Sequence, residues 1–72
     1  MNNGGMDEIK TVDGLIDALG GTTKTATIFG VSPPAVSNWR RTGFPPRLHF
    51  RIVREAKTRG LAFDERIFEA AA

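Results

Sequence analysis

Three polar side chains carry the clearest binding chemistry in this sequence of 72 residues: Ser37, Asn38 and Arg41. At helical spacing they share one face, because residues three or four apart lie on adjacent turns. An asparagine amide can pair with the edge of adenine, and an arginine guanidinium with the edge of guanine. These side chains therefore predict contacts with base edges in a groove of double-stranded DNA.

Catalytic and metal-binding chemistry has no comparable pattern. His49 is the single histidine, and the chain has no cysteine. The adjacent carboxylates at 7–8 and at 64–65 would point apart on a helix. Lys24 lies outside the pattern of a phosphate-binding loop. We therefore expect no enzymatic activity, no metal and no cofactor.

The net charge of +2 conceals an uneven distribution of charge along the chain. Residues 20–60 carry eight basic side chains and one acidic side chain, a net +7, whereas segments 1–19 and 61–72 carry −3 and −2. Concentrated positive charge attracts a polyanion. The alternative is a solvated basic face, but the charge coincides with the polar residues above and so favours nucleic acid.

Segment 22–41 contains the elements that must position the polar face. A first short helix ends at Gly30, where a turn with positive φ would be costly for other residues. Ser32 is a good N-cap and Pro33 suits the first position of a second helix, which is expected to end at about Arg41. Two short helices joined by such a turn predict a helix-turn-helix.

The opposite face of this second helix is apolar. Val36 and Trp39 are three residues apart and can point inward together. Phe44 follows the helix and is expected to fill the core beside Trp39. Trp39 is therefore interpreted as a core residue and not as a platform for stacking bases.

The segment from Gly20 to Arg47 resembles the helix-turn-helix of phage Cro-like and YdaS-like repressors. The resemblance rests on the pattern V-S-x-x-A-V-S-x-W from Val31 to Trp39 and on the Gly-Phe-Pro exit at 43–45, and it covers less than half of the chain. The resemblance implies that bases are contacted by Pro33, Pro34, Ser37, Asn38 and Arg41.

Pro34 departs from the family pattern, in which glutamine, serine or arginine is frequent at this position. Its side chain offers no hydrogen bond and can make only an apolar contact, for instance with a thymine methyl group. It also disfavours α geometry at Pro33, so the helix start could shift by one residue. The alternative, which we favour, is a rigid first turn that fixes the angle of insertion.

Phosphate contacts are expected from the start of the first helix and from the basic residues that follow the second. The free amides and positive dipole end of a helix can hold a phosphate. The arginines at 47, 51 and 54 form one helical stripe, which could extend these contacts or be a solvated face. The predicted phosphate contacts are Thr22, Thr23, Lys24, Arg40 and Arg47.

The rest of the chain predicts an all-α fold of about five short helices around a helix-turn-helix core. Residues 1–10 are expected to be a flexible tail and residues 11–72 a single domain. Thr11 can cap a helix reaching about Leu19, another helix should run over about 46–58, and a short last helix over about 65–70. Phe50 is interpreted as lying at the core edge, with an exposed aromatic for a partner as the alternative.

The sequence as a whole predicts a sequence-specific DNA-binding regulator, most simply a Cro-like repressor that acts by occupying an operator in a bacterial or host cytoplasm. A homodimer on a palindromic site is expected, with no membrane and no small-molecule ligand. Leu61–Ala71 is the candidate dimer surface, unless it only closes the monomer core. The alternatives are a nonspecific nucleoid-type DNA binder and a protein-interaction module.

Overall fold

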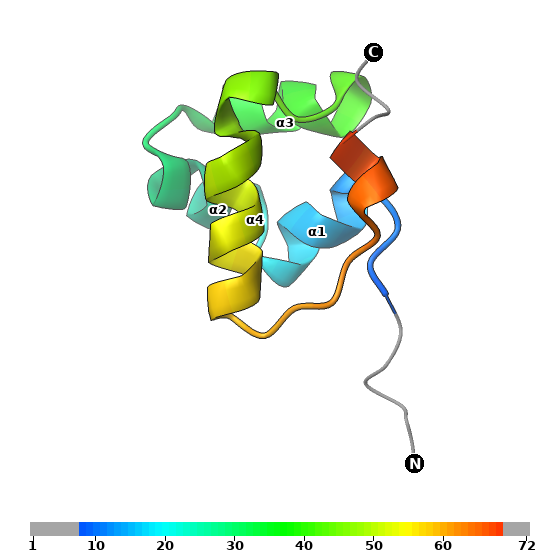
Figure 1. Cartoon of the computed structure of the whole chain (residues 1–72). Helices are drawn as coiled ribbons and strands as arrows, with labels where there is room; N and C mark the ends of the chain where they lie inside the picture. Colours follow the sequence, from blue (N-terminus) through cyan, green and yellow to red (C-terminus); the bar gives the residue numbers. More distant parts are fainter. Residues whose placement is uncertain (1–7, 69–72) are drawn as a thin grey trace.

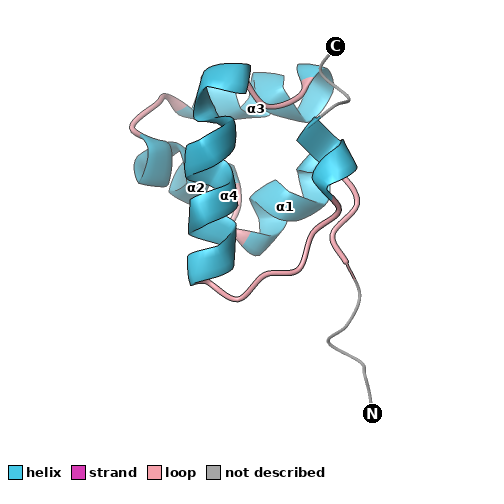
Figure 2. Ribbon diagram, in the orientation of Figure 1, coloured by secondary structure: helices cyan, strands magenta, loops and turns pink. Residues whose placement is uncertain are grey.

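Residues 8–68, the part of the chain that this computed structural model describes, contain four α-helices and two short 3-10 helices. The described part is all-α, as expected, apart from an isolated bridge between Ile9 and Phe63. No helix in this part is long and apolar enough to span a membrane. In chain order the elements are α1 (Val12–Ala18), α2 (Thr22–Phe29), α3 (Pro33–Thr42), η2 (Pro46–Leu48), α4 (His49–Thr58) and η3 (Glu65–Phe68) (Figures 1 and 2).

The predicted caps begin two of the helices. The hydroxyl of Thr11 accepts a hydrogen bond from the Gly14 amide at 2.9 Å and opens α1. The hydroxyl of Ser32 accepts from the Ala35 amide at 3.4 Å, and both prolines stand in the first turn of α3. Such caps satisfy amides that have no partner within the helix. The sequence therefore determines where these helices begin.

The core lies between the helices and takes apolar residues from all of them. Trp39 is 6% exposed and Phe44 is 2% exposed, and their rings meet edge to face with centroids 5.8 Å apart. Trp39 also meets Phe29 edge to face at 6.3 Å. The interpretation of Trp39 and Phe44 as core residues is confirmed. The buried apolar set is Leu15, Ile16, Leu19, Ala26, Phe29, Val36, Trp39, Phe44, Leu48, Ile52, Ala56 and Ile67.

The predicted helix over 46–58 is divided in two. Pro46–Leu48 forms the 3-10 helix η2, and α4 follows directly with Leu48 as its N-cap residue. Amides in the first turn have no partner within the helix, so prolines at the start are compatible with an α-helix, as at Pro33, or with a 3-10 turn, as at Pro46. The last predicted helix is also a 3-10 helix, η3, as far as residue 68; residues 69 and 70 lie outside the described part.

The two ends of the described chain run side by side, with the N-terminal segment next to the stretch that follows α4 (Figure 1). The Ile9 amide donates to the Ala62 carbonyl at 2.9 Å, and the Asp64 amide donates to the Ile9 carbonyl at 2.8 Å. Of the predicted tail, residues 1–7 lie outside the described part. Ile9 itself packs partly buried against the core and belongs to the folded domain.

The segment after α4 closes the monomer core. Ile67 is 4% exposed, and the ring of Phe68 lies 5.6 Å from that of Phe44. Asp64 accepts hydrogen bonds from the side chain and the backbone of Arg66 at the start of η3, and these bonds lower the pKa of the Asp64 carboxyl. Residues 61–68 therefore pack on the monomer core, the alternative role expected for Leu61–Ala71, while the use of this segment in a dimer stays a prediction. Residues 69–71 lie outside the described part.

Phe50 is 74% exposed, so its interpretation as a core-edge residue is wrong. Leu48, Ile52 and Ala56 of the same stretch are buried. At about 100° per residue, Phe50 lies some 160° from Ile52, nearly on the opposite face of α4. Helical periodicity therefore places Phe50 in solvent, and its hydrophobicity does not draw it into the core.

Candidate functional site

A short turn joins α2 to α3 and fixes one helix against the other. Gly30 ends α2 with φ 69°, a left-handed conformation that favours glycine. The Val31 amide then donates to the Ala26 carbonyl at 3.0 Å. Ala26 is 2% exposed, and its small side chain suits a point where two helices approach closely. The turn leaves only Val31 and Ser32 between Gly30 and the first residue of α3.

The outer face of α3 carries the predicted base contacts, and the structure brings all five together. Each of them is exposed, and together they line one open hollow of about 480 Å³. The inner face of the same helix holds the buried Val36 and Trp39. The orientation of α3 is therefore set by its buried face, and the residues presented outward are Pro33, Pro34, Ser37, Asn38 and Arg41.

The two prolines begin α3 without displacing it. The helix starts at Pro33, with Ser32 in an extended conformation as N-cap, so the possible one-residue shift does not occur. Pro34 then forms part of the exposed hollow. It offers no hydrogen-bond donor there, so any contact that it makes with a ligand is apolar.

Asn38 and Arg41 are linked on this outer face. Arg41 Nη2 donates to Asn38 Oδ1 at 2.7 Å, a short hydrogen bond to a charged donor. Thr42 Oγ1 donates to the Asn38 carbonyl oxygen at 3.0 Å, one turn further along. Two of the five side chains expected to contact bases thus contact each other in the unbound protein.

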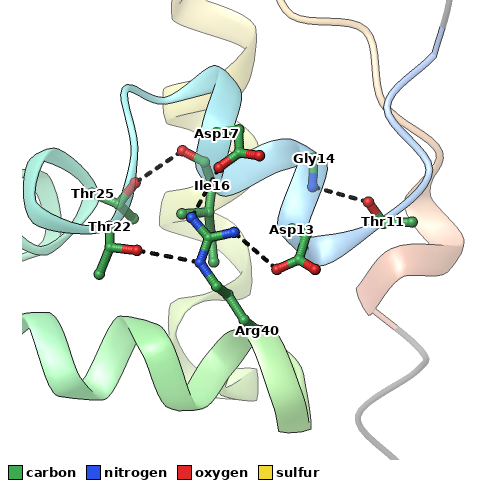
Figure 3. Close-up of polar contacts among 8 residues, drawn as sticks. All are labelled: Thr11, Asp13, Gly14, Ile16, Asp17, Thr22, Thr25 and Arg40. Atoms are coloured by element: carbon green, nitrogen blue, oxygen red, sulfur yellow. Dashed lines mark hydrogen bonds and ion pairs between the residues drawn. The ribbon is translucent and has the colours of Figure 1, made fainter.

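Arg40 points away from this face and ties α3 to α1 (Figure 3). Its Nη1 and Nη2 donate to Asp13 Oδ1 and Asp17 Oδ1, each at 2.9 Å, and its Nε donates to Thr22 Oγ1 at 3.2 Å. The hydrogen bonds with Asp17 and Asp13 raise the pKa of the guanidinium. A phosphate contact by Arg40 would have to compete with two ion pairs, so Arg40 has a structural role in the unbound chain.

Sequence reasoning missed this network because Asp17 and Asp13 precede Arg40 by 23 and 27 residues in the chain. Asp13 and Asp17 are four residues apart, which places both carboxylates on one face of α1. That spacing is the signal that could have predicted a shared cation. A second tie between helices is the hydroxyl of the buried Thr25, which donates to the Ile16 carbonyl at 3.4 Å (Figure 3).

The other predicted phosphate contacts occupy separate places. Thr22 is half-buried and is engaged by Arg40, whereas Thr23 and Lys24 are exposed and line a hollow at the start of α2 with Arg59. No side chain caps α2, so the Thr23 hydroxyl makes no capping hydrogen bond there. Arg47 is exposed in η2 and lines a different hollow.

Charge pairing separates the basic residues into two groups. Within residues 8–68, ion pairs engage Arg40, Arg59 and Arg66. Arg51 lies over the ring of Phe29, near the turn between α2 and α3, with its guanidinium carbon 5.7 Å from the ring centroid. No ion pair among the described residues involves the second group, which is Lys10, Lys24, Arg41, Arg47, Arg51, Arg54 and Lys57.

The described residues also hold no cluster of histidine, aspartate and glutamate side chains that could bind a metal ion. Comparisons of the chain with protein families, with curated proteins and with solved structures found no match. The features of this chain that bear on function are therefore the outer face of α3 and the charges around it.

Proposed function

We propose that this protein is a sequence-specific binder of double-stranded DNA in which α2 and α3 form a helix-turn-helix, and that it acts as a Cro-like transcriptional repressor. The single observation that carries the proposal is the outer face of α3, where three hydrogen-bonding side chains and two prolines, all exposed, line one hollow. A helix held by Val36 and Trp39 on its buried face can present the other face to a major groove without rearrangement.

Unpaired positive charge supports DNA over other ligands. Lys24 at the start of α2 and Arg47 in η2 lie on either side of α3 in the chain, and neither has an ion-pair partner among residues 8–68. Phosphate contacts from such residues fix the register of a protein on a duplex, and base contacts then provide specificity. Repression follows from occupancy of the operator and needs no further domain.

The nonspecific alternative is favoured by the same unpaired arginines, and a competition experiment separates the two. The labelled probe is a site selected from random duplexes, and the competitor is random duplex at fixed salt. A sequence-specific regulator should prefer its site by about a thousandfold or more. Equal competition would support the nucleoid-type binder, and no salt-dependent binding at all would support a protein-interaction module.

Lys24→Ala is expected to weaken binding to every DNA sequence alike. Each lost phosphate contact should reduce the slope of log K against log salt by about one. The measurement is a salt titration of binding by fluorescence anisotropy. Lys57→Ala, which removes the same charge from an exposed position of α4, is the matched control and should leave the slope unchanged. An unchanged slope for Lys24→Ala would remove Lys24 from the phosphate contacts.

Homodimerisation is proposed to use the surface around Phe50. Phe50 is the one large hydrophobic side chain that is strongly exposed among the described residues, and it stands beside a hollow of about 360 Å³ lined also by Pro46, His49 and Val53. A twofold interface requires a patch that complements itself, and this patch contains both a protruding ring and a recess.

Phe50→Glu is expected to give a folded monomer. The variant should fold because the ring that it replaces is exposed in the monomer. It should not dimerise, because its carboxylate would be buried against the same carboxylate of the second copy. Analytical ultracentrifugation measures the oligomeric state, and circular dichroism measures the fold. Thr58→Glu adds the same charge at the exposed end of α4 and should remain dimeric. If Phe50→Glu dimerises as the wild type does, the interface lies elsewhere.

A further inference from the structure

We propose that Asn38 and Arg41 act as one unit that reads guanine, in which Arg41 contacts the base and Asn38 positions it. The inference rests on the proposed DNA binding and names the base that this part of α3 recognises. The sequence alone favours a direct contact between the amide of Asn38 and adenine.

The geometry of the pair is the starting point. Arg41 Nη2 donates to Asn38 Oδ1 at 2.7 Å, and both side chains are exposed in the hollow on the outer face of α3. The neighbouring Arg40 is drawn towards the carboxylates of α1, so two consecutive arginines have different roles. Arg41 has no carboxylate partner among residues 8–68, so its remaining N–H groups are not engaged in an ion pair.

The hydrogen-bond donors and acceptors that the pair presents favour one base over the others. An asparagine that pairs with adenine needs its oxygen to accept from N6 and its amide nitrogen to donate to N7. One of the two lone pairs of the Asn38 oxygen accepts from Arg41, so an adenine N6 amino group would have to share that oxygen with the guanidinium and lie beside its N–H groups. Arg41 can donate from its remaining N–H groups, so the pair presents donors.

Guanine matches a surface of donors, because its major-groove edge offers the two acceptors N7 and O6. Adenine and cytosine each present an amino group there, which would face a donor of the protein. The link also restrains a long side chain before binding, so less conformational freedom is lost when the guanidinium meets the base. Asn38 is therefore a positioning residue for the contact that Arg41 makes.

Selection of binding sites from random duplexes tests the inference, with wild type, Arg41→Ala, Asn38→Ala and Asn38→Asp compared. The wild type should select a consensus with guanine at one position, and Arg41→Ala should reduce that preference roughly ten- to a hundredfold. Asn38→Ala should weaken the preference at the same base pair and leave the others unchanged. Measured affinities of the double variant should show that the two effects do not add.

Asn38→Asp separates positioning from direct contact. Aspartate keeps an acceptor for Arg41 but has no amide donor, so the guanine preference should persist while overall affinity falls through repulsion from phosphates. Ser37→Ala is the matched control on the same face and should alter a different base pair. Circular dichroism checks that each variant is folded, as expected for exposed positions.

The possible failures are distinguishable. A wild-type protein that selects no consensus overturns the proposed function and this inference together. A consensus in which Asn38→Ala and Arg41→Ala alter different base pairs, or in which Asn38→Ala removes an adenine preference, overturns the inference and leaves the function standing. Loss of the guanine preference in Asn38→Asp would likewise contradict a positioning role.

Discussion

Trp39→Ala is expected to leave the protein largely unfolded. The indole is 6% exposed and contacts Phe29 and Phe44 edge to face. Truncation of a buried aromatic costs about 3–5 kcal/mol, because the transfer free energy is lost and a cavity remains. Small domains have a net stability of about 5 kcal/mol, so this loss is comparable with the whole free energy of unfolding. Urea denaturation followed by circular dichroism measures the difference.

Two further variants keep the experiment decisive. Trp39→Phe retains an aromatic ring between Phe29 and Phe44 and should remain folded with reduced stability. Ser37→Ala, at an exposed position two residues away, should have nearly the stability of the wild type. A folded Trp39→Ala protein that has lost DNA binding would contradict the structural role and place the indole at the nucleic acid.

Local signals predicted the helix boundaries well where a residue acts on its own backbone. Thr11 and Ser32 each cap a helix through their hydroxyls, and Gly30 ends α2 in the left-handed conformation. These effects depend on a few consecutive residues, so the sequence alone contains them. The 3-10 geometry of η2 was harder to predict from the sequence, because two prolines are compatible with either an α or a 3-10 first turn.

Contacts between distant segments were not predictable in the same way. The Arg40 network joins α3 to carboxylates of α1, and the choice of Arg40 over Arg41 as the partner depends on how the two helices cross. Adjacent arginines look equivalent in a sequence, yet one side chain lies against α1 and the other on the outer face of α3. The predicted set of outward residues on α3 needed only helical periodicity, and the structure brings that set together.

Phe50 illustrates the limit of hydrophobicity as a guide to burial. Its ring is as apolar as that of Phe44, but α4 turns it about 160° from the buried Ile52. Only the periodicity of the whole helix, anchored by Leu48, Ile52 and Ala56, determines its side. The unexpected exposure of Phe50 is the reason that the proposed dimer contact moves from the segment after α4 to α4 itself.

Ser37→Glu is expected to abolish sequence-specific DNA binding while leaving the fold intact. Ser37 is exposed on the outer face of α3, between Pro33 and Arg41 in the hollow proposed to face the major groove. A carboxylate there would be held close to phosphates and to acceptor atoms of the bases. Like-charge juxtaposition at an interface costs several kcal/mol, so the affinity should fall by about a hundredfold or more.

Ser37→Gln is the matched control, because it has nearly the shape of glutamate without the charge. It should bind DNA more tightly than Ser37→Glu at low salt, and the difference should shrink as salt screens the repulsion. Affinity is measured on the selected operator at several salt concentrations, with urea denaturation to verify equal stability. If Ser37→Glu binds the operator as the wild type does, the outer face of α3 does not meet DNA, and the proposed function loses the surface on which it rests.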